Sequence, residues 1–161
     1  MSKSEDLESK FWKALESDKT VMLGIDGAED GHTRPMTAQV PEHKAPIWFF
    51  ATRDDALVQK IRVDSRAVAT FASKGHDIFA TLQGTLSIDT SRESVDRLWT
   101  RSVAAWYPLG KEDPTLVLLK FDAQRAEIWR HESSVFAGVK LLFGSEPRKE
   151  RANDVAEIRL T

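Results

Sequence analysis

Thr52 and Lys60 flank a short segment whose residue types suit the binding of an anion. Residues 47–51 form an apolar, aromatic run of strand length, and this run ends abruptly in the hydroxyl of Thr52. Residues 57–61 have the pattern of one short helix, which would bring the Lys60 ammonium beside the end of the strand. A hydroxyl and an ammonium at the end of an apolar wall suit a ligand with a flat body and a phosphate tail.

Arg34 is a third candidate for this anion site. It belongs to the predicted strand 32–40 and, by the period of two, shares a face with apolar residues such as Met36. Such an arginine is either a strand-end side chain that reaches water or an anion ligand at the mouth of a barrel, and this strand alone favours neither. Pro35 has no backbone N–H to donate, so we expect an edge strand or a bulge there.

Composition narrows the class of protein that could carry such a site. The chain has 161 residues, which indicates a single domain, and its 41% hydrophobic and 30% charged residues are ordinary for a soluble globular protein. A net charge of −2 gives no support to nucleic-acid binding. The absence of cysteine excludes disulfides and thiolate zinc sites. No apolar stretch is long enough to span a membrane and no signal peptide is evident, so a cytoplasmic location is the default expectation.

The strands are expected to form a small antiparallel barrel. Alternation and turn signals predict six strands joined in hairpins, with flanking helices, which is a mainly β, α+β fold. Residues 47–51 lack alternation, so both faces of that strand should be covered. Gly84 interrupts the long strand 78–88 and predicts a bulge or a close backbone approach. The last hairpin is expected from residues 115–122 and 126–131.

Helices are expected at the start, middle and end of the chain. Residues 2–16 have an apolar stripe at helical spacing, and Ser2 with Glu5 can form a capping box. Residues 90–93 form a second capping box that begins a helix to about Val103.

The C-terminal extension, about residues 131–161, lies beyond a core of about residues 11–130. Residues 135–143 are very apolar, and we expect them to pack on the barrel or on a partner chain. Residues 144–161 are charged and are expected to be loosely held.

No catalytic set carried by the protein itself stands out. The sequence has no glycine-rich nucleotide loop and no nucleophile elbow, and its four histidines have no zinc spacing. Chemistry would therefore come from a cofactor. Trp106 and Tyr107 lie in a loop with prolines and glycine; they either plug the barrel or form an aromatic lid over a ligand, across a subunit interface in one version.

Several of these segments together resemble a known family. Arg34-Pro35-Met36, residues 47–52, Lys60, the long strand with its glycine, and the Trp-Tyr-Pro-x-Gly sequence from Trp106 resemble the FMN-binding split barrels of the pyridoxamine 5′-phosphate oxidase superfamily. The general stress protein branch is the most similar, and the resemblance covers about residues 11–129.

The resemblance implies a homodimer with FMN in each groove between the two chains. It also implies which residues bind the cofactor, although it does not separate FMN from FAD. By this resemblance Arg34, Thr52 and Lys60 hold the phosphate, the backbone around Met36, Phe49 and Ala51 forms the wall beside the isoalloxazine, and Trp106 and Trp129 come from the partner chain.

The expected cofactor predicts the class of function. We expect a flavin-dependent oxidoreductase that acts on a small molecule or NAD(P)H, or alternatively a flavin-binding module that buffers or senses flavin without turnover. Residues 130–134 depart from the substrate-phosphate segment of the true oxidases, which argues against pyridoxamine 5′-phosphate oxidation. A third possibility is a barrel without cofactor, or one that binds haem through His131 or His32.

Overall fold

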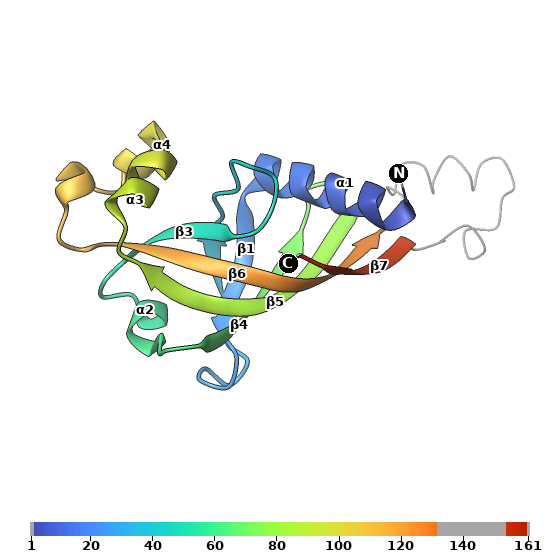
Figure 1. Ribbon diagram of the computed structural model, residues 1–161, viewed down its shortest axis with the longest axis horizontal. Helices are drawn as coiled ribbons and strands as arrows, with labels where there is room; N and C mark the ends of the chain where they lie inside the picture. Colours follow the sequence, from blue (N-terminus) through green and yellow to red (C-terminus); the bar gives the residue numbers. More distant parts are fainter. Residues whose placement is uncertain (1, 132–153, 161) are drawn as a thin grey trace, which may run out of the picture.

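The computed structural model describes residues 2–131 and 154–160, and its main element is one antiparallel sheet (Figure 1). The sheet has seven strands in the order β2-β1-β4-β5-β6-β3, with β7 paired to β6 outside this path. The two ends of the path, β2 and β3, meet only at an isolated bridge between Gln39 and Trp48. The sheet therefore curls into a barrel that stays open between β2 and β3, which confirms the predicted split barrel. The strands are β1 (Thr20–Ile25), β2 (Arg34–Thr37), β3 (Ile47–Thr52), β4 (Ser65–Ala72), β5 (Ile78–Asp89), β6 (Leu116–Arg130) and β7 (Asp154–Arg159).

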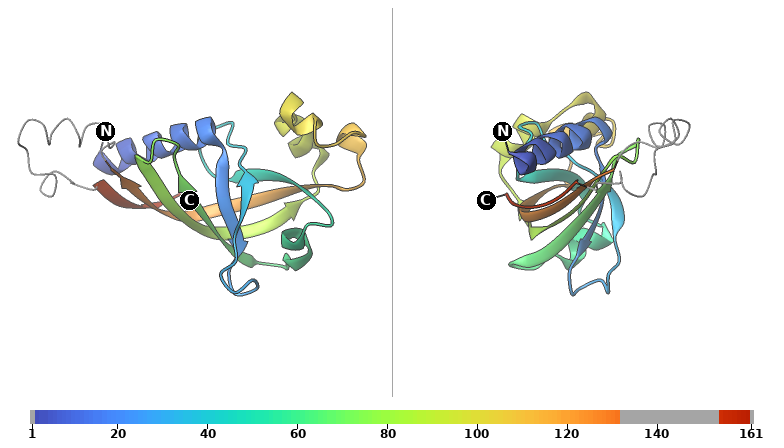
Figure 2. Two further views of the ribbon diagram at one scale, coloured as in Figure 1. Left: turned by 180° about the vertical axis from the view of Figure 1, so that it is seen from behind. Right: turned by 90° about the vertical axis from the view of Figure 1, so that its right-hand side faces the viewer.

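The helices cover the sheet where the strands leave apolar surface exposed. The long helix α1 (Lys3–Asp18) lies over the sheet beside β5, β6 and β7 (Figure 2). Its predicted capping box is confirmed: the Glu5 N–H donates to the Ser2 hydroxyl at 3.1 Å, and the Ser2 N–H donates to the Glu5 carboxylate at 2.7 Å. The remaining helices are α2 (Ala56–Lys60), α3 (Arg92–Leu98), α4 (Arg101–Ala104) and a 3₁₀ turn at Gly110–Glu112.

Two apolar clusters hold these layers together. The main core lies between α1 and the inner face of the sheet, and its fully buried members include Phe11, Leu15, Leu23, Phe49, Leu82, Phe121 and Ile128. A smaller cluster lies between α3 and the other face of β3 and β6, where Trp48 contacts Val95, Leu98 and Leu118. Both faces of β3 are thus covered, as its lack of alternation predicts.

The predicted last hairpin is wrong, because β6 is one continuous strand of 15 residues. Residues 123–125 do not turn; Ala123 and Arg125 stay paired with Gly84 and Gln83 of β5, and Gln124 is the extra residue where the register shifts. The prediction for Gly84 is confirmed, since a Cβ there would lie 2.1 Å from the Asp122 carbonyl oxygen. The bulge absorbs the irregularity that the sequence suggested was a turn.

The charged C-terminal segment is not loosely held throughout. Residues 154–159 form β7, which pairs with β6 from Arg125 to Arg130 and raises the strand number from six to seven. The Asp154 carboxylate also pairs with the Lys3 ammonium at 2.5 Å. Backbone pairing orders this charged segment, and the described part of the chain end is a strand where a helix was expected. Residues 135–143 lie outside the described residues.

The middle helix is shorter than predicted and is divided in two. Its N-cap is Ser91, whose hydroxyl accepts the Ser94 N–H at 3.3 Å, and not Thr90. The helix ends at Leu98, and Thr100 caps the separate helix α4 through the Val103 N–H at 3.2 Å. A second N-cap so close to the first interrupts the helix, because an N-cap residue takes an extended backbone.

Candidate functional site

A groove lies in the gap between the two edge strands, β2 and β3. Its volume is about 280 Å³, just below the roughly 300 Å³ at which small-molecule pockets typically begin. Pro35 lies on its β2 side, so the expected edge position of this proline is confirmed. The groove is lined by Pro35, Met36, Thr37 and Gln39 on one side, by Phe50, Ala51, Thr52 and Asp55 on the other, and by Ser102, Val103, Trp106 and Tyr107 from the α4 segment.

Backbone groups of β3 face this groove. Trp48 exchanges both backbone hydrogen bonds with Gln39, at 2.8 and 3.1 Å, on the side away from β6. Because direction alternates along an antiparallel strand, the N–H and C=O of Phe50 point toward the same open side. The Thr52 N–H points there as well and donates to the Asp55 carboxylate at 2.9 Å. Trp48 and Thr52 use these groups within the chain, so the split in the barrel leaves the N–H and C=O of Phe50 for a ligand.

Tyr107 fixes the α4 segment against the groove wall. This side chain is buried, and its hydroxyl donates to the Ala51 carbonyl at 2.7 Å. Burial raises the pKa of Tyr107, so its hydroxyl keeps its proton and remains a donor at neutral pH. Phe50 packs edge-on against Trp99, with ring centroids 6.0 Å apart, and supports the same wall.

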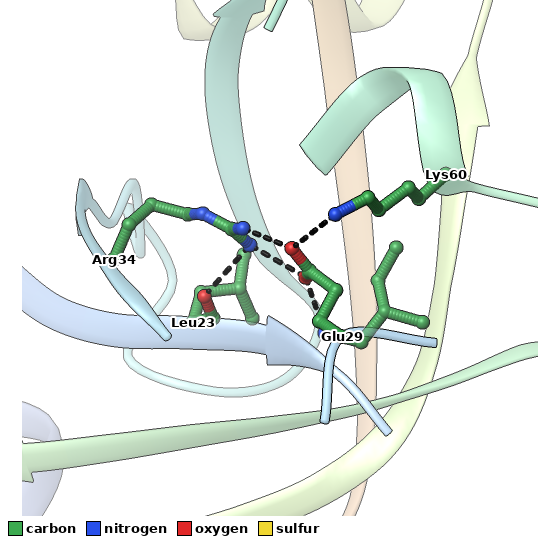
Figure 3. Close-up of polar contacts among 5 residues, drawn as sticks. Leu23, Glu29, Arg34 and Lys60 are labelled. Carbon is green, nitrogen blue, oxygen red and sulfur yellow. Dashed lines mark hydrogen bonds and ion pairs between the residues drawn. The ribbon is translucent and has the colours of Figure 1, made fainter. Parts of the chain in front are cut away.

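Glu29, Arg34 and Lys60 form a charged cluster on elements that also contribute to the groove lining (Figure 3). Arg34 directly precedes the groove residue Pro35, and Lys60 ends helix α2, which Asp55 begins as N-cap. Arg34 makes a bidentate ion pair with the Glu29 carboxylate, with Nη1 donating at 2.7 Å to Oε1 and Nη2 bonded to Oε2. The Lys60 Nζ lies 3.5 Å from Oε2 of the same carboxylate. The two predicted cations therefore converge, and they do so on an acid.

The buried Glu29 carboxylate is paired with cations of its own chain. The Glu29 side chain is fully buried, and the Arg34 guanidinium, with the Ile25 N–H and Lys60, lowers the pKa of Glu29 to about 2. The same pair raises the pKa of Arg34. Glu29 and Arg34 are therefore charged at neutral pH, and together with Lys60 the cluster has a formal charge of +1.

Comparison with known proteins identifies the family. Residues 6–146 match the family model described as pyridoxamine 5′-phosphate oxidase like. The chain belongs to this family. No curated protein matches the sequence.

Solved structures of general stress proteins share this fold. A general stress family protein from Xanthomonas campestris pv. campestris is 53% identical over 83% of this chain and 93% of that chain, with a TM-score of 0.78. A general stress FMN/FAD binding protein from Xanthomonas citri is 55% identical over 81% of this chain and 92% of that chain, with a TM-score of 0.76. General stress protein 26 from Jannaschia sp. CCS1 is 28% identical over 97% and 99% of the two chains, with a TM-score of 0.81.

The residues that the family resemblance pointed to are only partly gathered at the groove. Met36, Ala51 and Thr52 line it, whereas Arg34 and Lys60 are not among its lining residues and meet at Glu29 instead. The Phe49 side chain is instead buried in the core, and the pairing pattern directs its backbone groups toward β6.

The two tryptophans lie in different places. Trp106 lies at the groove of its own chain and is 82% exposed. Trp129 lines a separate hollow of about 450 Å³ with Met22, Thr70 and Phe79 on the outer face of β1, β4, β5 and β6.

Sequence reasoning missed Glu29 and the role of Tyr107. Glu29 belongs to the turn between β1 and β2, where no periodicity marks a residue as buried. The available signal was Arg34 itself, because a cation on an apolar face needs a counter-ion. Within residues 2–131 and 154–160, no histidine lines the groove, and no helix is both long and apolar enough to cross a membrane.

Proposed function

We propose that this protein binds FMN in the groove between β2 and β3, with the phosphate held by Arg34, Lys60 and Thr52. The observation that carries this proposal is the convergence of two cations from β2 and α2, whose neighbours Pro35 and Asp55 line a groove between open strand edges. Charge-assisted hydrogen bonds from Arg and Lys to a phosphate contribute roughly 1.5–3 kcal/mol each. The relative from Xanthomonas citri, named an FMN/FAD binding protein, supports flavin as the ligand.

The flavin ring has a suitable surface in the same groove. Backbone groups of Phe50 at the open edge of β3 suit the polar edge of an isoalloxazine, and the side chains of Met36 and Trp106 offer apolar contact. Ala51 lines the groove wall beside Phe50, and Phe49 packs in the core behind that wall. The ring would therefore bind mainly through shape and main-chain hydrogen bonds.

We further propose a homodimer in which the second chain completes the groove. The groove of one chain is small for a flavin, and the outer sheet face around Trp129 and Phe79 presents apolar surface that a second copy would cover. Trp129 of the partner subunit would then be available to the ring, as the family resemblance implies. A two-fold pair uses the same patch twice and leaves no open end.

Redox turnover is the activity that we propose for the complex. Bound flavin supplies hydride exchange with a small molecule or NAD(P)H. The chain binds and orients the cofactor and excludes water, while Tyr107 holds its own proton on the Ala51 carbonyl. Flavin storage or sensing without turnover is the alternative outcome of the test below.

The test begins with the absorbance spectrum of the purified protein and an FMN titration. We expect a yellow protein with one FMN per chain, bleached under anaerobic conditions by NADPH, and with a sedimenting mass twice 18.1 kDa. The Trp129→Arg variant should sediment as a monomer. A yellow protein that no pyridine nucleotide bleaches would favour storage or sensing. A colourless protein with no affinity for FMN would refute the proposal.

A further inference from the structure

Glu29 is the one inward-facing residue of an otherwise exposed turn. Its neighbours from Asp26 to Gly31 are exposed, and Gly27 and Gly31 take positive φ angles of 79° and 80°. The turn folds the Glu29 side chain back until its Oε1 accepts the Ile25 N–H at 3.0 Å. A carboxylate is costly to bury, so its burial here depends on the partners that it meets.

The cluster is layered, with the acid behind the cations. The Glu29 side chain is 0% exposed, whereas Arg34 is 20% and Lys60 46% exposed. Figure 3 shows the carboxylate between Arg34, which approaches from β2, and Lys60, which approaches from α2. An incoming anion would therefore meet the cations and would not need to displace the carboxylate.

A count of hydrogen bonds shows which N–H donors of Arg34 have no partner among the described residues. A guanidinium has five N–H donors. Nη1 donates to Glu29 and to the Leu23 carbonyl, the latter at 3.3 Å, and Nη2 uses one donor on Glu29. Among the described residues, the Nε–H and the second Nη2–H have no partner, so two donors stay available in a guanidinium whose plane is already fixed.

We infer that Glu29 is a positioning residue for the phosphate of the cofactor: it fixes the Arg34 guanidinium from behind so that the remaining donors, together with Lys60, present a preformed anion site. This inference rests on the proposed function. Fixing these groups in advance means that the long arginine side chain loses little freedom when the anion binds.

Charge and position predict opposite effects for a change at Glu29. If only its charge mattered, neutralising it would tighten phosphate binding, because a nearby negative charge would be gone. If its position matters, Glu29→Gln weakens binding, because the amide N–H groups of glutamine confront guanidinium donors and release Arg34. Glu29→Asp keeps the charge but shortens the side chain by one methylene, so it changes only the position of the carboxylate.

The experiment measures FMN and riboflavin affinity side by side, since riboflavin lacks only the phosphate. We expect Glu29→Gln and Glu29→Asp each to weaken FMN binding about tenfold or more. Riboflavin affinity should remain within about twofold of the wild type. In an Arg34→Ala background, Glu29→Gln should bring no further loss of FMN affinity, because the group that it positions is absent.

Asp30→Asn is the matched control. It removes one negative charge from the same turn, and asparagine tolerates the φ of 54° at this position. It should bind FMN like the wild type. If both Glu29 variants bind FMN as tightly as the wild type or more tightly, the inference is refuted. If the wild type itself shows no preference for FMN over riboflavin, the proposed phosphate site fails instead.

Discussion

The charged cluster of Glu29, Arg34 and Lys60 differs from the mouth of the groove at Trp106 in how far each is paired within one chain. At the cluster, the Glu29 carboxylate is paired with both Arg34 and Lys60 inside a single chain. At the mouth, Trp106 is 82% exposed. The anion site that we propose is thus held in place within one chain, whereas the surface proposed for the ring needs a ligand or a second chain to remove it from water.

The largest expected effect comes from removing the cluster. Removal of both cations alone would leave the Glu29 carboxylate buried without a partner, so the variant combines Arg34→Ala, Lys60→Ala and Glu29→Gln. We expect FMN affinity to fall about 100-fold or more, because two charge-assisted contacts at roughly 1.5–3 kcal/mol each are lost. Riboflavin affinity should be unchanged in the same fluorescence titration.

Arg66→Ala with Lys74→Ala is the control, because it likewise removes one arginine and one lysine, here from β4 and the turn after it, outside the groove. Equal loss of FMN and riboflavin in the triple variant would show that the cluster supports the whole groove and not the phosphate.

The next effect concerns the free energy of unfolding, and it tests whether the ion pairs of Glu29 stabilise the fold without any ligand. The folded-state pKa of Glu29, about 2, lies below its ordinary value of 4.5, so its ionised form stabilises the fold above that value. The contribution, about 3 kcal/mol, should be lost as pH falls from about 4.5 to 2. Urea unfolding of Glu29→Gln should show a deficit of this size at pH 7 that disappears near pH 2. A deficit that persists undiminished in acid would contradict the assignment.

The smallest effect is expected at the mouth. Because Trp106 is mostly exposed, Trp106→Ala should change the free energy of unfolding by less than about 0.5 kcal/mol. It should nevertheless weaken both FMN and riboflavin binding several-fold, since an aromatic contact with the ring contributes roughly 0.5–1.5 kcal/mol. Leu109→Ala, in the same exposed loop but outside the groove lining, should leave flavin affinity unchanged. A large loss of stability in Trp106→Ala would place this residue in the core and remove the contrast.

Local features of the chain were predictable where one residue type dictates the backbone. Pro35 at an edge, Gly84 at a close approach and the Ser2 capping box each follow from the chemistry of a single residue. The continuity of β6 and the pairing of β7 depend on long-range partners, which propensity does not encode. A charged segment such as Asp154–Arg159 forms a strand because β6 offers it a complementary edge.

The residues of the candidate site likewise divide into those that their own type predicts and those that depend on distant partners. Arg34, Thr52 and Lys60 could be selected because their types and spacing suit an anion, and Arg34 and Lys60 do converge. Glu29 was not selected from its turn, although Arg34 five residues later needed a counter-ion. The second partner of Glu29, Lys60, is distant in sequence and comes near it only when the barrel forms.

The gap between β2 and β3 also bears on how the protein is handled. An unpaired strand edge is a template on which another chain can add, and such contacts start aggregation. Pro35 and the brevity of β2 blunt one edge, but β3 keeps the exposed main chain of Phe50. A ligand bound in the gap would shield that edge. Cultures supplied with riboflavin should therefore yield less aggregated protein than cultures without it.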